Sequence, residues 1–449
     1  MPLTENATAD SGASGKTSEA YRKKFQIRLI TVLVGGMFLD GYILGIIGPV
    51  AHTIETNVVG MTTAWIGLEA ASALIGIMIG SPIGGWLADK LGRKPLLFWD
   101  IVLFTVASAA QLFVDGPLEL FLVRLAMGLA VGIEYAVGWP LLAEFAPTHL
   151  RGRLLGGTVI AWYAGFCVAY IVGYYLNKAG VSWNIVLATS TPIAVAILIG
   201  RIGLPESPLW LWSKGKQDQA KGIVGKYLDT DYMTDMVKAK SGGPAGSIAM
   251  LFSPSVWRST LFTAGFWACA VTPYFAIATF ADNLLKDFGL TGLLGGVSLS
   301  VFAVLGVTAT ILVVDRVKRR TLTVPPQWIA AIVLVIAGLW AGAPPMIMLA
   351  LFLLFSFLNA GYTAMTAIYP SEVFPTEVRG LGTGFAAAGS RVGAAAGLFL
   401  IPISIENLGV STTVLIAAAI TFAGAALSQW LAPETGGKPL SELAENVSH

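Results

Sequence analysis

Long apolar runs separated by short charged segments dominate this sequence. A helix of about 20 apolar residues spans the hydrocarbon core of a bilayer. Only 12% of the residues are charged, whereas a soluble domain carries about 25%. We therefore predict an all-α membrane protein with twelve transmembrane helices. The runs lie at 28–50, 61–88, 95–114, 118–145, 154–176, 183–203, 259–281, 291–314, 321–341, 345–369, 379–403 and 410–431.

The longest polar interval lies at 204–258 and divides the runs into two sets of six. The first 20 residues are polar and lack the apolar core of a signal peptide. The predicted organisation is a disordered cytosolic tail (1–27), a six-helix bundle (28–203), a cytosolic linker with short helices (204–258), a second six-helix bundle (259–431) and a cytosolic tail (432–449).

The basic residues predict the orientation. Of the 28 lysines and arginines, Lys178 and Lys286 fall in the loops on one side, and Arg124 and Arg391 fall well within runs. The remaining basic residues lie in the tails, the linker and the loops on the other side, or at the ends of the runs that adjoin them. Cytoplasmic loops are enriched in lysine and arginine, so we predict that both termini of this multi-pass cell-membrane protein are cytoplasmic.

The two bundles repeat one another. The segment from Leu142 to Gly152 returns as Pro370 to Gly380, so that Glu144 corresponds to Glu372 and Arg151 to Arg379, 228 residues later. Asp89 similarly returns as Asp315, ahead of Arg319.

Three motifs carry a family resemblance. Gly85, Asp89, Gly92, Arg93 and Lys94 resemble the signature loop of the major facilitator superfamily, and the segments beginning Pro205-Glu206-Ser207-Pro208 and Pro433-Glu434-Thr435 are similar to motifs of sugar porters. The resemblance covers nearly the whole chain. It implies a substrate site at mid-membrane between two parallel six-helix repeats.

The same resemblance implies a gate of ion pairs that holds the cytosolic ends of the two bundles together in the outward-open state. A purely structural role for its individual members is the alternative. The candidate gate residues are Asp89, Arg93, Glu144, Arg151, Asp315, Arg319, Glu372 and Arg379.

Charges within the runs require an explanation, because each costs about 2.5–3.5 kcal/mol on insertion scales. Asp40 and Glu134 lie near the middle of their runs. A buried carboxylic acid can take up and release a proton as solvent access changes, so both are candidate proton carriers. Arg124 and Glu69 are expected to couple protonation to gating. Alternatively, Asp40 is a static partner of Arg124, and Glu134 binds a cationic substrate.

Arg391 is the only charge deep within the second set of runs. Its setting, Gly389-Ser390-Arg391-Val392-Gly393, resembles helix 11 of aromatic-acid and organic-anion transporters, where the arginine meets the substrate carboxylate. A guanidinium suits that bidentate contact. The alternative is an internal salt bridge to Asp40 or Glu134.

The sugar-porter pattern is missing at the expected pocket. The glutamine pair of helix 7 falls on Cys269-Ala270, the helix-10 tryptophan on Ala367, and the helix-11 Gln-Trp on Ser390-Arg391. The sequence therefore disfavours a hexose. The candidate contacts besides Arg391, each of which has packing within the bilayer as its alternative, are Tyr42, Tyr135, Trp139, Trp162, Tyr163, Trp267, Tyr274, Asn359 and Tyr362.

These patterns favour proton-coupled uptake of a small organic anion, aromatic carboxylates included, by a monomer that is not an enzyme. No phosphate-binding loop or metal-ligand cluster occurs in the sequence, and we expect no cofactor, metal or nucleic-acid partner. The alternatives are a carrier of an organic cation or of a neutral metabolite or sugar, with Glu134 or Asp40 as ligand, and a facilitator that is not coupled to protons.

Overall fold

The computed structural model describes residues 9–58, 60–61, 63–147, 149–228, 247–286, 293–340, 342–375, 377–436 and 438, and every regular element among them is a helix. The first part, called the N-half, comprises α1 Ala9–Gly45, η1 Gly48–Val50, α2 Ala51–Asn57, α3 Thr63–Leu91, α4 Arg93–Ala110, η2 Gln111–Phe113, α5 Pro117–Phe145, α6 Arg151–Lys178, α7 Trp183–Ala188 and α8 Ser190–Arg201.

Short helices follow and lead to the second part, called the C-half. The intervening helices are α9 Pro208–Ser213, α10 Gln217–Tyr227 and α12 Ile248–Leu251. The C-half comprises α13 Trp257–Lys286, α14 Leu293–Val313, α15 Arg319–Leu339, α16 Pro345–Thr363, α17 Met365–Val373 and α18 Arg379–Leu431.

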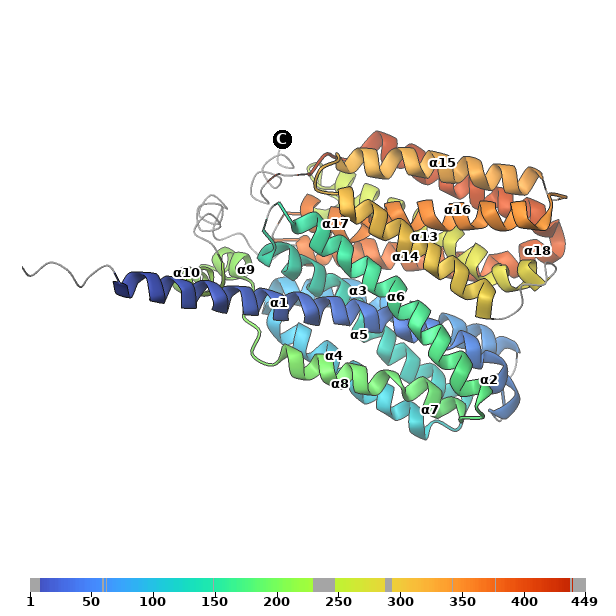
Figure 1. Ribbon diagram of the computed structural model, residues 1–449, viewed down its shortest axis with the longest axis horizontal. Coiled ribbons are helices and arrows are strands. Elements are labelled where there is room, and N and C mark those ends of the chain that lie inside the picture. The colour runs from blue at the N-terminus through green and yellow to red at the C-terminus, as the bar shows by residue number, and fades with distance from the viewer. Residues whose placement is uncertain are drawn as a thin grey trace, which may run out of the picture.

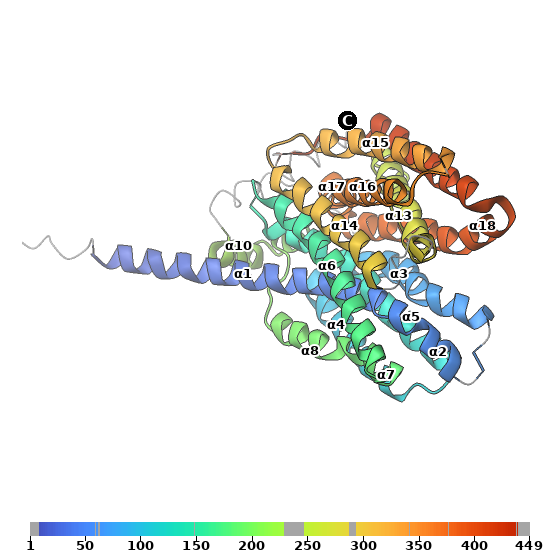
Figure 2. The same cartoon turned by 45° about the vertical axis from the view of Figure 1, so that its right-hand side comes forward.

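The two halves lie side by side, with their long helices running along the same direction. Figure 1 shows the N-half in blue to green below the C-half in yellow to red, and the rotated view in Figure 2 keeps the two bundles distinct. Across the interface, α3 and α5 pack against α18, and α6 packs against α14. We call the end of the molecule that carries α9 and α10 the linker end, and the end that carries α2 and α7 the far end.

Two glycines allow sharp changes of chain direction. Gly92 has φ 102° between α3 and α4, and Gly409 has φ 79° within α18, so that α18 is two helices joined at a kink. Residues with a Cβ rarely adopt positive φ. The charged turn after α3 therefore reverses the chain within a single residue, which keeps Asp89 and Arg93 close together at the linker end.

Nine helical stretches in the described residues are long and apolar enough to span a membrane. They correspond to nine of the predicted runs. The other three runs, 259–281, 291–314 and 379–403, coincide with α13, α14 and the first part of α18, and each includes side chains outside the described residues. Twelve transmembrane helices thus stay a prediction.

The first helix overlaps the range that was predicted as a tail. Helix α1 begins at Ala9, within the range 1–27 that the sequence suggested was a disordered tail. The boundaries of the tails, the bundles and the linker stay predictions.

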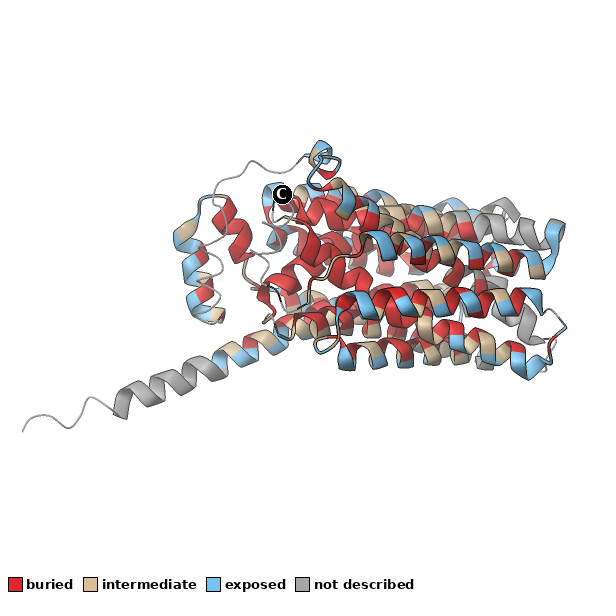
Figure 3. Cartoon of the chain, turned by 90° about the horizontal axis from the view of Figure 1, so that it is seen from above, coloured by how far each residue is buried: buried red, intermediate tan, exposed pale blue. Residues whose placement is uncertain are grey.

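Buried residues concentrate along the contact between the two halves. Figure 3 shows the buried positions along the inward sides of the helices and most densely toward the linker end. Most are apolar, but the buried set also includes charged residues in both halves. These buried charges define the candidate sites described next.

Candidate functional site

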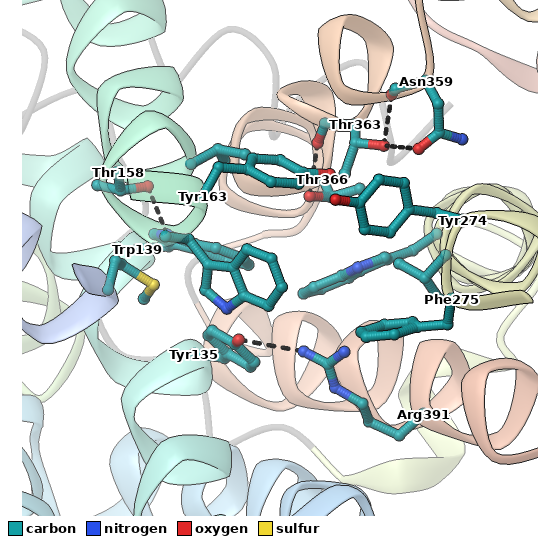
Figure 4. Close-up of a pocket in the computed structure, with 15 residues that line it drawn as sticks. Tyr135, Trp139, Thr158, Tyr163, Tyr274, Phe275, Asn359, Thr363, Thr366 and Arg391 are labelled. Atoms are coloured by element: carbon teal, nitrogen blue, oxygen red, sulfur yellow. Dashed lines mark hydrogen bonds between the residues drawn. The ribbon is translucent and has the colours of Figure 1, made fainter. Parts of the chain in front are cut away.

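A cavity lies between the halves, lined by residues of α1, α5 and α6 on one side and of α13, α16, α17 and α18 on the other. Its volume is about 50 Å³, which holds only a few water molecules, so a metabolite enters only after side chains or helices move. The lining residues are Met37, Tyr135, Trp139, Thr158, Val159, Trp162, Tyr163, Trp267, Val271, Tyr274, Phe275, Asn359, Thr363, Thr366 and Arg391 (Figure 4).

Aromatic rings form most of the cavity wall. Tyr135 and Trp139 are stacked with their ring centroids 5.0 Å apart, and Trp267 lies 5.3 Å from Trp139 across the two halves. Tyr163 meets Tyr274 edge to face at 5.6 Å. Such rings offer broad apolar faces to a flat or ring-shaped ligand.

Arg391 is the charged residue among those that line the cavity. Its Nη2 donates a hydrogen bond to the Tyr135 hydroxyl at 3.1 Å, and its guanidinium lies 5.3 Å from the centroid of the same ring. The side chain is buried, and its Nε has no hydrogen-bond partner. Among the described residues, no carboxylate forms an ion pair with Arg391.

Uncharged polar groups complete the wall. Asn359 donates from Nδ2 to the Ala270 carbonyl at 3.0 Å and to the Tyr362 hydroxyl at 2.6 Å. Trp139 donates from Nε1 to Thr158 at 2.9 Å (Figure 4). Sequence reasoning missed Thr158, Thr363 and Thr366, although the spacing of Asn359 from Thr363 and Thr366 places all three near one face of the same chain segment.

Seven of the nine predicted contact residues line the cavity, and two do not. Tyr42 belongs to an apolar cluster at the far end and bonds to Thr189 at 2.8 Å between hydroxyl oxygens. Tyr362 is buried behind Asn359. Both were predicted to be contact residues because they are polar aromatic residues of the predicted helices. The prediction failed because packing between helices, rather than residue type, determines which side of a helix faces the cavity.

The predicted proton carriers lie in the N-half beside the cavity wall. Asp40 is buried, and its Oδ2 has no hydrogen-bond partner. The charges that act on it are those of Glu134, Arg201 and Arg391. Asp40 therefore lies between the cavity arginine and a second group of charges in the N-half.

That second group includes a residue the sequence analysis overlooked. Arg201, at the end of α8, forms ion pairs with Asp100 at 2.7 Å and with Glu134, and it donates a hydrogen bond to the Leu97 carbonyl at 2.7 Å. Asp100 therefore belongs to this group of charges and not to the Asp89 turn. Arg201 was counted among the basic residues of the linker side because it follows the last apolar residues of its run.

Arg124 and Glu69 lie within electrostatic reach of one another toward the far end, and neither carboxylate oxygen of Glu69 has a hydrogen-bond partner. Of the two partners considered for Arg124, the structure brings it to Glu69, since each is the charged group that acts on the other. Both side chains are buried. The geometry does not join this pair to Asp40.

At the linker end, the predicted gate residues of the N-half meet the C-half. Glu144 forms ion pairs with Arg93 at 3.2 Å and with Arg379, from the other half, at 3.3 Å. Asp89 accepts hydrogen bonds from the backbone amides of Gly380 and Leu381, at 3.3 and 2.9 Å. A carboxylate at a helix N-terminus is favourably placed, so this contact fixes the start of α18 against the end of α3.

The C-half repeats the arrangement with its own residues. Arg319 approaches Glu372 at 3.6 Å and Asp315 at 3.8 Å. Across the interface, Arg153 pairs with Asp315 at 3.1 Å, and Arg151 donates to the Lys438 carbonyl at 3.2 Å. All eight predicted gate residues thus lie in two related groups at the linker end.

The segments after the two bundles also correspond. Glu206 accepts from the backbone amide of Arg93 at 2.9 Å, and Glu434, 228 residues later, accepts from that of Arg319 at 2.9 Å. Ser207 donates to Glu144, just as Thr435 donates to Glu372. In each half, the segment that follows the last helix of the bundle therefore adds contacts to the predicted gate residues.

Comparisons with known proteins agree with this architecture. The family model for "Sugar (and other) transporter" matches residues 29–447. The chain belongs to the sugar (and other) transporter family. It is 34% identical over 425 residues to the inner membrane metabolite transport protein YgcS of Escherichia coli strain K12, which covers 93% of each chain.

Solved structures show the same fold. The chain resembles the proton:xylose symporter XylE bound to 6-bromo-6-deoxy-D-glucose, with a TM-score of 0.82, 22% identity, and coverage of 95% of this chain and 99% of that one. Against the inward-open conformation of XylE from E. coli, the TM-score is 0.69 at 22% identity, with 94% and 99% covered. This protein is a multi-pass cell-membrane transporter of the major facilitator superfamily, in the sugar and metabolite class, and not an enzyme.

Proposed function

We propose that this protein takes up a small organic anion together with protons, by alternating access. The observation that carries the proposal is Arg391: a buried guanidinium in the wall of a central cavity, without an ion-pair partner among the described residues. An unpaired buried charge is costly, and a ligand carboxylate would satisfy it with two parallel hydrogen bonds. The Tyr135 hydroxyl holds the guanidinium until the ligand arrives.

The aromatic wall narrows the class of anion. Tyr135, Trp139 and Trp267 lie next to one another beside the guanidinium. A carboxylate attached to a ring would meet Arg391 with its charged end and these faces with its apolar end. Aromatic carboxylates are therefore the favoured substrates.

Asp40 is the proposed proton carrier that connects with this site. It is within electrostatic reach of Arg391 on one side and of Glu134 and Arg201 on the other. A proton on Asp40 would remove a negative charge that competes with the ligand for Arg391, so proton uptake and anion binding would support each other. An uncoupled facilitator would not need this acid.

The proposed orientation has twelve transmembrane helices, with the linker end and both termini in the cytoplasm. The distribution of lysine and arginine supports it. The ion pairs at the linker end then close the cytoplasmic side, which agrees with the lower TM-score against the inward-open symporter. The protein is proposed to act as a monomer.

A neutral sugar is the second candidate. It is favoured by the family assignment and by the fold shared with a xylose symporter, and the cavity offers Asn359, Thr363 and Thr366 as hydrogen-bonding groups. An organic cation held by Glu134 has less support, because Glu134 does not line the cavity and already pairs with Arg201.

The test is a thermal-shift screen of purified protein against aromatic and aliphatic carboxylates, sugars and quaternary amines, at mildly acidic and at neutral pH. We expect carboxylates to stabilise the protein, more strongly at acidic pH. Arg391→Ala should weaken that binding by about 2–5 kcal/mol, while the matched control Arg258→Ala, at the start of α13, should bind normally.

A neutral sugar substrate predicts a different result in the same screen. If sugars stabilise the protein and Arg391→Ala leaves their effect intact, then Arg391 has a structural role and the substrate is neutral. Stabilisation by quaternary amines would likewise contradict the anion proposal, but the assignments of fold and family would stand.

A further inference from the structure

Helices α4 and α5 and the segment 201–207 each contribute both to the gate and to the buried charges around Arg201. Helix α4 carries Arg93 and Asp100, and α5 carries Glu144 and Glu134. The third segment, 201–207, begins with Arg201 and ends with the gate contacts of Glu206 and Ser207. The two sets lie about 10 Å apart along α4 and about 15 Å apart along α5, at 1.5 Å per residue.

We propose that Asp100, Glu134 and Arg201 form a proton-sensitive lock that holds the gate closed, with Arg201 as its positioning residue. The ion pairs of Arg201 join α8 to both α4 and α5. While they persist, the three segments that present Arg93, Glu144 and Glu206 keep one relative position. The inference deepens the proposed function and rests on it, since it adds a link from the proton site to the gate.

The charge balance of the lock requires a proton. Asp40, Asp100 and Glu134 are buried with Arg201 as the guanidinium among them, and each of these four groups leaves one polar atom without a hydrogen-bond partner. Asp100 and Glu134 also interact with each other through their side chains. Three carboxyl groups thus surround one guanidinium, and a proton on one of them would bring the charges of the group closer to balance.

The groups that face the lock come from every element packed against it. Asp40 approaches from α1, Tyr135 belongs to α5, and Arg391 reaches Asp40 from α18. These connect the lock to the cavity. A second proton, on Glu134 or Asp100, would neutralise the partner of Arg201 and weaken the bonds between α8, α4 and α5, so that the gate opens toward the linker end.

A substitution at Gly36 of α1 offers an independent way to disturb the lock. A Cβ at this position would lie 2.5 Å from Oε1 of Glu134 and 2.8 Å from Nη2 of Arg201. Alanine would therefore push the ion pair apart without removing a charge. The close approach shows that the sequence of α1 leaves room for the pair.

The experiment measures the opening of the gate without a substrate. In full-length protein with Cys167 and Cys269 replaced by alanine, Ser371→Cys places a thiol beside Glu372, where the serine is fully buried. The rate of maleimide labelling in proteoliposomes is followed against pH and corrected with a free thiol. We expect it to rise as pH falls, by up to about tenfold per pH unit for one coupled proton.

Neutral substitutions in the lock should remove this response. The double variant Asp100→Asn/Glu134→Gln should label at the fast rate at every pH, because Arg201 then has no carboxylate partner in the lock. Each single variant and Gly36→Ala should move the profile, and Arg201→Lys should retain part of it. Glu119→Gln, the same change in the exposed first turn of α5, should behave like the parent. Any lock variant that does not fold is replaced by Gly36→Ala, whose charges are intact.

An unchanged pH profile in Asp100→Asn, Glu134→Gln or Gly36→Ala would overturn the lock. A parent protein without pH-dependent labelling would overturn it as well. The anion proposal is tested by a different experiment, the ligand screen with Arg391→Ala, so the two proposals can fail independently. A protein that binds sugars and still loses its pH response in the lock variants would keep this inference and lose only the substrate class.

Discussion

The gate is built twice in this molecule, and the interior is not. Glu144, Arg93 and Glu206 in one half match Glu372, Arg319 and Glu434 in the other, down to the backbone amide that each final glutamate accepts from. Inside the membrane the halves diverge. The N-half buries Asp40, Glu69, Asp100, Arg124, Glu134 and Arg201, whereas Arg391 is the deep charge in the runs of the C-half.

This difference suggests that both halves have the same role at the linker end and different roles in the interior. The proposed closure of the linker end uses matching contacts from both halves, because each half is held to the other. The proposed transport chemistry needs two unlike groups, an acid that takes up a proton and a cation that meets an anion. The two halves are accordingly alike at the linker end and unlike in their buried charges, and the charge of Arg391 acts on Asp40 across the two halves.

The largest expected effect tests how equal the two gates are. Glu144 holds two arginines, from both halves, and accepts from Ser207, all of them buried. Glu144→Gln should lower the free energy of unfolding by about 3–5 kcal/mol, because it removes the carboxylate charge from two buried ion pairs. Glu372→Gln, where Arg319 lies farther away at 3.6 Å, should cost about 1.5–3 kcal/mol.

Chemical denaturation of both variants in detergent measures this difference. Spin labels on Lys94→Cys and Lys318→Cys, one in each half at the linker end, should report a wider mean distance in Glu144→Gln than in Glu372→Gln. Equal costs would mean that the two gates carry equal weight despite their different geometry.

The next effect tests how closely the halves approach. A Cβ at Gly85 of α3 would lie 2.3 Å from the carbonyl oxygen of Gly380 in α18. Gly85→Ala should destabilise the closed linker end by about 1–3 kcal/mol, the usual cost of overpacking. The same pair of spin labels should show a longer distance.

Gly157→Ala is the matched control, since a Cβ at Gly157 of α6 meets nothing within 4 Å. Alanine in an open helical position should stabilise by about 0.5–1 kcal/mol and leave the distance unchanged. A normal distance in Gly85→Ala would show that the contact between α3 and α18 does not hold the gate.

A third prediction tests the division of labour in the interior. Asp40→Asn should abolish accumulation against a gradient but preserve exchange of substrate across proteoliposomes, because the substituted site binds ligand and carries no proton. One coupled proton supplies about 1.4 kcal/mol per pH unit, so the accumulation ratio should fall from about tenfold to one at that gradient. Undiminished accumulation would assign the coupled proton to another acid.

The sequence predicted the gate better than it predicted the interior, for a physical reason. Gate residues such as Glu144 and Arg379 lie at helix ends whose spacing along the chain is repeated, so the local motif determines where they lie. The partner of Glu134 depends on which face of α8 turns inward, and Arg201, at the end of its run, was indistinguishable from the basic residues that follow it. The pairing of Asp100 with Arg201 depends on the same orientation of α8.

Tyr42 gives the smallest effect and marks the boundary of the cavity. Sequence reasoning placed it with Tyr163 among the contact residues, but its hydroxyl bonds to Thr189 within the far-end cluster, whereas Tyr163 lines the cavity. Tyr42→Phe should cost about 1 kcal/mol of stability, the net value of one hydrogen bond, and leave ligand affinity unchanged. Tyr163→Phe serves as the matched change inside the wall. If Tyr42→Phe weakens ligand binding in the thermal-shift assay, then the binding site extends toward the far end. The N-half would then contact the ligand there, in addition to its proposed role in carrying the proton.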